Sequence, residues 1–364
     1  MKKFLKVFFI NLMIFALCIE FFSFILVKMS ILPNGLPPNL ILTAHEKFSY
    51  WHPINSKLKI ATKCWSSEVE FNNIGIKSDK DIITKKFKKR IAIMGDSMTE
   101  NGQLSNNNDF TKYLQNLFPK YEVINFSVSS VGLADQIKIY KNLVNQYNVD
   151  YVFLYLSHND FSDNHISEFR GNREAYDIIN GKVVNVNADK TEFFKYYNSN
   201  WNKFKREKLI YIKKNLHTFK LYYHLKWYLI SLKYKDSKDK NLKLKKSKNK
   251  NNYFDQKEKI FSYLVEKANL EIFSKVPTLI FMNSHNFDFT NKNVVIEEMK
   301  KNLVNYNVFD PQQEFIKYLT ANNQLKKPYL GYSCDAHYSE LGIKLLSKYT
   351  LEKFLELKKN NVIE

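Results

Sequence analysis

The chain has 364 residues, of which 45% are hydrophobic, and a formal net charge of +20. This apolar content excludes a largely disordered chain, and the length suffices for one large core or two modest ones. The positive charge suits an anionic partner such as phospholipid headgroups, acidic polysaccharide or nucleic acid, but it also suits the Lys- and Asn-rich composition of an AT-rich genome. The three cysteines form no CxxC motif or Cys/His cluster, so the sequence gives no basis for a structural zinc site.

The first thirty residues predict a membrane anchor. Lysines precede an apolar stretch from Val7 to Val27, and Lys28 closes it. A helix of roughly 20 apolar residues spans the hydrocarbon layer of a bilayer. Because positively charged flanks stay in the cytoplasm, we expect the body of the protein on the outer side, periplasmic or extracellular.

Two features within this stretch bear on the kind of anchor. No small-x-small cleavage site follows the apolar run, and Cys18 follows Leu17, where a lipidated cysteine needs a small residue. We therefore expect residues 1–29 to remain as an uncleaved anchor, with a cleaved signal peptide as the alternative. Glu20 is costly inside a bilayer when ionised, so it must snorkel, stay protonated or pair with another helix.

Residues 30–89 are assigned to a stalk and a lead-in segment, because prolines cluster in "ILPNGLPPNL". The two cysteines beyond the anchor, Cys64 and Cys334, leave two alternatives open. One disulfide between them would suit an oxidising compartment, and two buried, unpaired thiols are the simpler interpretation.

From residue 90 to 160, short β-prone runs alternate with segments of helical spacing. "RIAIMG", "YEVINF" and "DYVFLYLS" read as strands, with helices between them. This alternation predicts a parallel sheet with helical crossovers, and chemistry in such sheets gathers at the carboxyl ends of the strands. Ser97, residues 127–132 and Asn159 all fall at such ends.

Residues from 161 to about 270 interrupt this pattern and are interpreted as an insertion. Asn180-Gly181 predicts a hairpin turn, and residues 204–232 form a basic, aromatic-rich helical stretch. Residues 233–252 hold nine lysines and two aspartates, which predicts a solvated loop. A further buried strand and a terminal amphipathic helix follow, so we expect a single α/β domain over residues 90–360 that carries this helical insertion.

The polar residues at the strand ends suggest nucleophilic catalysis. A serine hydroxyl needs an imidazole to take its proton and a carboxylate to orient that imidazole, and the developing oxyanion needs fixed donors. The sequence offers Ser97, Asn159 in "SHND", and Asp335 with His337 in "CDAHYSELG". Ser97 taken alone is more often a helix cap. The presence of Ser97 together with Asn159 and the Asp335–His337 pair, in this order, favours a nucleophilic role for Ser97.

These blocks resemble the SGNH (GDSL-type) hydrolases, from about residue 71 to the C-terminus. The resemblance implies a flavodoxin-like three-layer α/β/α sandwich with a parallel sheet. It makes Ser97 the nucleophile and, through its amide, an oxyanion donor. Ser130 in "VINFSVSSVG" stands where the family has a glycine whose amide is the second donor, and Asn159 supplies the third. His337 is then the base and Asp335 its partner.

Two further features of the resemblance concern the substrate. The Asp-x-His form of the last block is seen in membrane-anchored and polysaccharide-modifying members. "NNIGIK" resembles a segment that precedes the catalytic domain of anchored members, with Ile76 and Lys77 in place of Phe and Arg. The resemblance therefore implies an acyl ester, most often acetyl, on a cell-surface glycan or lipid. Hydrolysis and transfer to a sugar hydroxyl both proceed through an acyl-Ser97 intermediate, so both stay open.

Other classes of function remain as alternatives. A membrane-anchored envelope scaffold with a degenerate pocket keeps the fold without the chemistry, and the side chain of Ser130, which narrows the approach, favours it slightly. The nucleophile elbow GxSxG of the α/β-hydrolase fold is absent. The Lys-rich run belongs to no recognisable nucleic-acid-binding module, so we expect no nucleic acid partner, and the resemblance implies no cofactor or metal.

Overall fold

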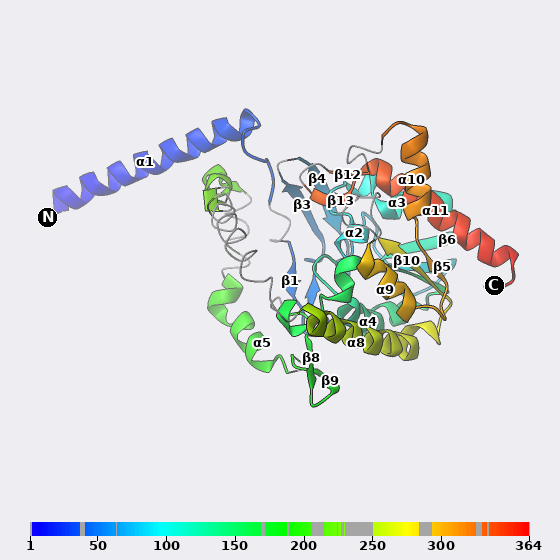
Figure 1. The fold of residues 1–364 in the computed structure, drawn as a ribbon. Helices are drawn as coiled ribbons and strands as arrows, with labels where there is room; N and C mark the ends of the chain where they lie inside the picture. Colours follow the sequence, from blue (N-terminus) through cyan, green and yellow to red (C-terminus); the bar gives the residue numbers. More distant parts are fainter. Residues whose placement is uncertain are drawn as a thin grey trace.

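A central parallel sheet organises the computed structural model (Figure 1). Residues 2–36, 41–62, 64–168, 172–187, 189–204, 208, 215–223, 225–226, 229, 250–283, 293–324, 330–332 and 335–363 are described. The sheet contains β5 (Lys89–Met94), β6 (Tyr121–Asn125), β7 (Tyr151–Ser157), β10 (Thr278–Asn283) and β11 (Val308–Phe309). Their spatial order is β11-β10-β7-β5-β6, and all neighbours are parallel. Counted along the chain this is 2-1-3-4-5, the flavodoxin-like order, so the predicted fold class is confirmed.

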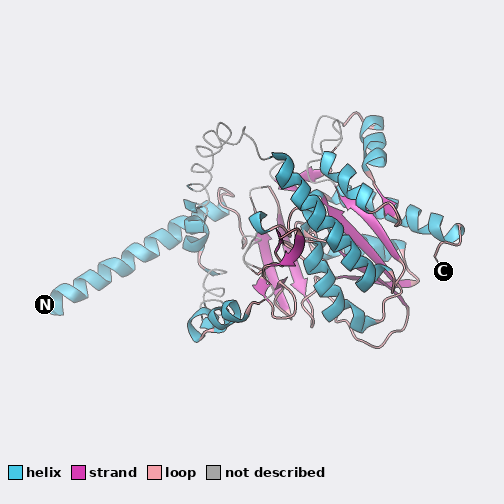
Figure 2. Cartoon of the chain, turned by 60° about the horizontal axis from the view of Figure 1, so that its bottom comes forward, coloured by secondary structure: helices cyan, strands magenta, loops and turns pink. Residues whose placement is uncertain are grey.

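Helices cover both faces of this sheet (Figure 2). Alternate strand residues point to opposite faces, so Ala92 and Met94 join one apolar core while Ile91 and Ile93 join the other. The first core lies under α4 (Leu133–Asn142), α8 (Lys250–Ala268) and α9 (Val294–Asn302). The second lies under α3 (Phe110–Leu117), α10 (Gln312–Ala321) and α11 (Glu340–Lys359). Together they make the three-layer sandwich.

The segment assigned to the insertion is not uniform. Helix α8 falls within residues 161–270, yet it buries Phe261 and Leu264 in the first core and forms part of a helical layer. The predicted hairpin is present as β8 (Tyr176–Ile179) and β9 (Lys182–Asn185). Asn180 and Gly181 have φ of 51° and 77°, the left-handed geometry that this turn requires. Residues 233–249 of the Lys-rich run lie outside the described residues.

The remaining short elements connect these layers. They are α2 (Ser97–Glu100), η2 (Asn106–Asn108), η3 (Val144–Tyr147), η4 (His158–Phe161), η5 (Ile166–Glu168), α5 (Thr191–Asn198), the π-helical turn η6 (Asn269–Phe273), and the hairpin of β12 (Gly331–Tyr332) with β13 (Asp335–Tyr338).

Most of the stalk and lead-in segment folds against the sandwich. β1 (Thr43–Ala44) pairs with β2 (Tyr50–Trp51), and β3 (Ser56–Ala61) pairs with β4 (Ser66–Phe71). Trp51 and Ile76 are buried in the first core, so the packing of this segment continues that of the α/β domain. Cys64 is in a disulfide, so the interpretation of unpaired thiols is wrong for this residue. Its proposed partner, Cys334, lies outside the described residues.

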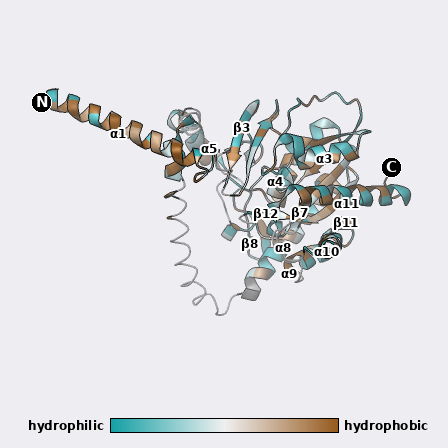
Figure 3. Cartoon of the chain, turned by 90° about the horizontal axis from the view of Figure 1, so that it is seen from above, coloured by the Kyte–Doolittle hydropathy of each residue, from teal (hydrophilic) through white to brown (hydrophobic). Residues whose placement is uncertain are grey.

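Helix α1 (Lys2–Lys28) projects away from this body (Figure 1). Its surface is largely apolar (Figure 3), and residues Lys3–Lys28 are long and apolar enough to cross a membrane. A signal sequence near an N-terminus has the same length and composition, so the helix alone does not distinguish an anchor from such a sequence.

Candidate active site

The turn after β5 brings Ser97 to the carboxyl end of the sheet. Gly95 is required there, because a Cβ at this position would lie 2.3 Å from Thr99 Oγ1 and 3.0 Å from the carbonyl oxygen of Tyr155. Asp96 caps α2, since its side chain accepts a hydrogen bond of 3.0 Å from the amide of Met98. The cap is therefore Asp96, and Ser97 is the first, half-buried residue of the helix. The interpretation of Ser97 as the cap is wrong.

Strand β13 brings Asp335 and His337 together. Residues two apart on a strand point to the same side, and the Nδ1 atom of His337 donates a hydrogen bond to Oδ1 of Asp335. The other carboxylate oxygen, Oδ2, accepts a hydrogen bond of 2.6 Å from the indole of Trp65. A carboxylate held in this way orients the imidazole and leaves its Nε2 side for a reacting group.

The charges around this pair set its protonation. Burial raises the pKa of Asp335, but the hydrogen bonds from His337 and Trp65 and the charge of His337 outweigh it, so the net shift is downward. Burial lowers the pKa of His337, but the hydrogen bond and charge of Asp335, with smaller contributions from Asp96 and Glu100, raise it above its usual value. The imidazole is therefore a stronger base than usual, and its partner is ionised.

The Asp335–His337 pair lies beside the helix that begins with Ser97. Helix α2 packs against β13, and Asp96 and Glu100, which flank Ser97 in the sequence, act electrostatically on His337. The structure thus brings the elements of all three predicted catalytic residues into one place. A hydrogen bond between Ser97 and His337 stays a prediction.

Asn159 follows β7 and lies at the same edge of the sheet. Its side-chain amide donates to Oδ2 of Asp163 at 2.7 Å and to Oδ2 of Asp96 at 3.2 Å. Both amide hydrogens are therefore engaged by carboxylates. Asn159 must exchange one of these bonds to donate to an oxyanion, and its role as a donor stays a prediction.

Ser130 has a backbone geometry that explains the glycine of the resembled family. Its φ is 64°, in the left-handed region that glycine adopts without strain. The residue is exposed, and its carbonyl oxygen accepts a hydrogen bond from Nε of Arg173. The backbone of this loop thus has a conformation that favours glycine, although a serine occupies it. The role of its amide as the second donor also stays a prediction.

Arg173 connects the two predicted donors Ser130 and Asn159. The guanidinium is buried, and its Nη2 lies 3.1 Å from Oδ2 of Asp163, the same oxygen that holds Asn159. One side chain therefore fixes the carbonyl of Ser130 and the carboxylate that orients Asn159. The sequence analysis missed Arg173, which lies in the range assigned to the insertion.

The lead-in segment also supports the loop that carries Ser130. The buried carboxylate of Glu100 accepts a hydrogen bond from the amide of Ser129, and its other oxygen lies 3.2 Å from Nε2 of His52. Burial raises the pKa of Glu100, but the charge of His52 and the hydrogen bonds from His52 and Ser129 bring it below its usual value. His52 is a second supporting residue that the sequence did not indicate.

Lys77, the last residue of the "NNIGIK" segment, contacts the chain that follows α2. Its buried ammonium group donates to the carbonyl oxygens of Asn101 at 2.8 Å and Leu104 at 2.7 Å, and it lies 3.1 Å from Oδ2 of Asp109. The charge of Asp109 is thereby paired. Lys77 fixes the chain directly after α2, and so supports the helix that begins with Ser97.

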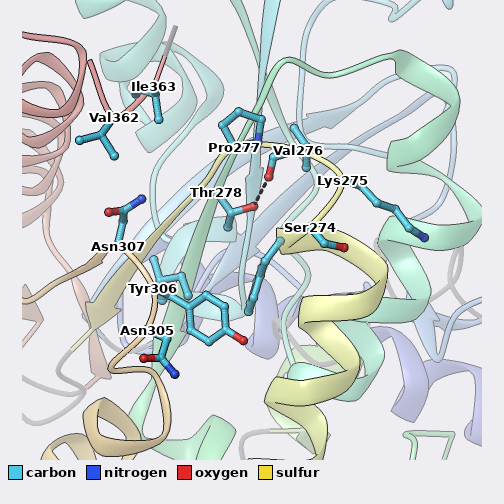
Figure 4. Close-up of a pocket in the computed structure, with 12 residues that line it drawn as sticks. Ser274, Lys275, Val276, Pro277, Thr278, Asn305, Tyr306, Asn307, Val362 and Ile363 are labelled. Atoms are coloured by element: carbon cyan, nitrogen blue, oxygen red, sulfur yellow. Dashed lines mark hydrogen bonds between the residues drawn. The ribbon is translucent and has the colours of Figure 1, made fainter. Parts of the chain in front are cut away.

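A cavity of about 380 Å³ lies at the other edge of the sheet (Figure 4). Pro277, Thr278 and Tyr306 line it, and Thr278 begins β10, so the cavity is at the amino end of the strands. It is separate from the site around Ser97. Among the described residues, no group of three or more His, Cys, Asp or Glu side chains is arranged to hold a metal ion.

No family model and no curated protein matches the sequence. The comparison with solved structures does give matches. An acetyl xylan esterase is 13% identical with a TM-score of 0.38, and the match covers 72% of this chain and 98% of that one. A lipase/acylhydrolase from Enterococcus faecalis is 12% identical with a TM-score of 0.40, covering 75% and 96%. A member of the lipolytic G-D-S-L family from Veillonella parvula is 13% identical with a TM-score of 0.37, covering 72% and 97%.

Proposed function

We propose that this chain, whose sequence blocks and strand order resemble those of the SGNH (GDSL-type) hydrolases, is a serine esterase that acts through an acyl-Ser97 intermediate. The observation that carries the proposal is the Asp335–His337 hydrogen bond on β13, packed beside the helix that begins with Ser97. A carboxylate–imidazole pair next to a serine is the arrangement that activates a hydroxyl.

Each residue has a defined part in this reaction. His337 takes the proton of Ser97 as the hydroxyl oxygen attacks the ester carbonyl, and Asp335 stabilises the imidazolium that forms. The oxyanion accepts hydrogen bonds from the amides of Ser97 and Ser130 and from the side chain of Asn159. Collapse of the intermediate breaks the bond to the alcohol, which receives the proton from His337. Water, deprotonated by His337, then releases the acid and restores Ser97.

We propose that the substrate is an acyl ester, first of all an acetyl ester, on a cell-surface glycan or lipid. The support is the apolar helix α1 with its lysine flank, which suits an anchor that leaves the body outside the cytoplasm. Transfer to a sugar hydroxyl needs the same intermediate, with an alcohol in place of water. The experiment below distinguishes the two.

The test is detection of the acyl-enzyme. The full chain in detergent is incubated with p-nitrophenyl acetate, with and without an oligosaccharide acceptor, and analysed by mass spectrometry. An acetyl group on Ser97 that water removes supports the esterase, and an adduct that persists until acceptor is added supports transfer. Absence of an adduct from a folded protein, also with longer acyl esters, would leave the envelope scaffold as the function.

Topology has its own test. A reporter enzyme that works only outside the cytoplasm, fused after residue 364, should be active. Activity of a reporter that works only in the cytoplasm would contradict the proposed location and with it the surface substrate.

A further inference from the structure

Glu20 of α1 is held by a segment nearly two hundred residues away in the chain. Its two carboxylate oxygens accept four hydrogen bonds: from the amide and Nδ1 of His217 at 2.7 and 2.9 Å, and from the amide and hydroxyl of Thr218 at 2.8 and 2.6 Å. The rings of Phe24 and His217 meet edge to face with centroids 5.2 Å apart. The sequence analysis left three alternatives for Glu20, and in the structure it is paired with another segment.

The position of Glu20 places this contact below the end of the span. Glu20 precedes Lys28 by eight residues, which is about 12 Å along an α-helix. With Lys28 at the headgroups, Glu20 lies inside a hydrocarbon layer that is about 30 Å thick. A carboxylate at this depth is stable only with polar partners. Residues 217–218 provide them, so these two residues lie below the headgroups together with Glu20.

The segment that reaches Glu20 exposes apolar side chains. In its described parts, residues 201–204, 208, 215–223, 225–226 and 229, the large side chains that are exposed are Trp201, Phe204, Leu216, Tyr222, Leu225 and Leu229. Trp201 is 64% exposed and Tyr222 58%. Lysines lie between them, and Lys220 donates a hydrogen bond of 3.0 Å to Asn34, just beyond the span. Aromatic side chains interspersed with lysines are typical of segments that lie at the membrane–water interface.

One contact just before this segment and one near its middle fix its place. Tyr197 of α5, just before it, accepts a hydrogen bond of 3.0 Å from the amide of Ala44 in the body. His217 and Thr218 hold Glu20 of α1. The segment therefore contacts the apolar helix α1, and the residue before it, Tyr197, contacts the body.

From these contacts we infer that the described residues 201–204, 215–223, 225–226 and 229 belong to an interfacial membrane-docking segment, which binds the bilayer with its exposed apolar side chains and is fixed to the anchor through Glu20. The occupant of its apolar surface is lipid, because the segment contacts the apolar helix α1 at Glu20 and Phe24 and carries lysines suited to anionic headgroups. The inference rests on the proposed membrane anchor. Its consequence is that the catalytic body is held against the membrane surface.

The test places an environment-sensitive fluorophore on the segment of the full chain. Tyr222→Cys, in a Cys18→Ser background, is labelled with nitrobenzoxadiazole and reconstituted in vesicles of phosphatidylcholine and phosphatidylglycerol. The emission should shift to the blue and be quenched by lipids brominated close to the headgroup. Val304→Cys is the matched control, because Val304 is an exposed apolar residue of the body, 76% exposed, and its label should show neither effect.

Two further measurements separate the possible failures. Release of the full chain from membranes by alkaline carbonate would overturn the proposed anchor and the inference together. A chain that stays in the membrane while the label at position 222 behaves like the label at 304 would overturn the inference alone. Glu20→Ala makes α1 more apolar and removes the four acceptor contacts, so the chain should stay inserted and the quenching at 222 should decrease. Unchanged quenching would contradict the role given to Glu20.

Discussion

Two buried arginines, Arg90 and Arg173, lie at opposite ends of the strands of the same sheet and differ in the groups to which they donate hydrogen bonds. Arg90, near the amino end of β5, is fully buried. Its Nη atoms donate to backbone carbonyls and its Nε atom donates to a carboxylate; the partners are Ile83, Thr84, Lys85, Tyr147 and Glu122. Every one of these contacts closes a turn or a strand end, so Arg90 supports the fold.

Arg173, at the carboxyl edge, is equally buried but contacts the carbonyl of Ser130 and the carboxylate of Asp163, which holds Asn159. Of these two partners Ser130 is exposed and Asp163 is buried, and both belong to the candidate site. The comparison shows that a buried charge does not identify a functional edge by itself, because both edges contain one. The two arginines are distinguished by the groups that they orient: Arg90 binds parts of the fold, and Arg173 binds parts of the candidate site.

Of the variants that compare the carboxyl and amino ends of the strands, Ser97→Ala should have the largest effect on activity. Removal of Ser97, the proposed nucleophile, should lower kcat by about 10⁴-fold or more, as for members of other catalytic triads, and abolish the acyl-enzyme adduct. Ser274→Ala, an exposed serine at the amino edge, is the control and should change neither rate nor adduct. Turnover of the activated ester gives the rates. Residual activity of Ser97→Ala close to the unsubstituted rate would assign the chemistry to another group.

A smaller loss is expected for Asn159→Ala. Loss of one oxyanion donor lowers kcat by about 10²-fold or more in comparable sites, while the acyl-enzyme still forms slowly. Asn305→Ala, at the cavity of the amino edge, should leave kcat unchanged. Equal rates for the two variants would show that Asn159 serves only to hold Asp96 and Asp163.

The two arginines themselves give the sharpest comparison. Arg173→Met should lower kcat about tenfold, because small displacements of donors are costly. Arg90→Met should leave kcat per folded molecule unchanged and lower the free energy of unfolding by about 2–3 kcal/mol, because the backbone carbonyls that Arg90 binds lose their donor. Thermal unfolding and active-site titration with the activated ester measure the two effects. If Arg173→Met loses only stability, then both arginines are structural.

The smallest effect concerns pH. The imidazole of His337 accepts a proton only when neutral, and its pKa is raised, so activity should fall as the pH decreases through a value above 6.5. Glu100 contributes to this raised pKa, so Glu100→Gln should lower the pKa of His337 and move the acidic limb of kcat/KM to lower pH. Glu192→Gln, an exposed residue of α5, is the control. A limb that stays in place in both variants would show that Glu100 does not act on the base.

Several parts of the fold could be predicted because they depend on neighbours in the sequence. Alternation of strands and helices with short connections indicated the parallel sheet, whereas its flavodoxin-like arrangement was implied by the family resemblance. The Asn180-Gly181 turn was predicted because its two left-handed residues are the ones that such a hairpin needs. The Asp335–His337 contact was predicted through family resemblance, and the physical reason is local, since residues two apart share one side of a strand.

The supporting residues of the site could not be predicted, because each acts across a long separation in the chain. Trp65 and Asp335 are 270 positions apart, and Arg173 reaches Ser130 from a segment that interrupts the recognisable pattern. One weak signal existed for Arg173: only four of the 56 basic residues are arginines, and the two that the structure describes are both buried. Arginine in a chain so rich in lysine indicates a position that needs its planar, multiply donating group.

By itself, the sequence determined β5, β6, β7 and β10 of the central sheet, the apolar N-terminal helix and the places where polar residues leave the sheet, since short-range periodicity and turn chemistry fix these. The short β11 and the strands β1–β4 of the lead-in segment were not predicted. Only the tertiary structure decided that His52 and Lys77 of the lead-in segment support the site, and that Glu20 is paired with residues 217–218. The reason is that a buried charge takes whichever partner the packed chain brings within hydrogen-bonding distance. That choice depends on the whole fold.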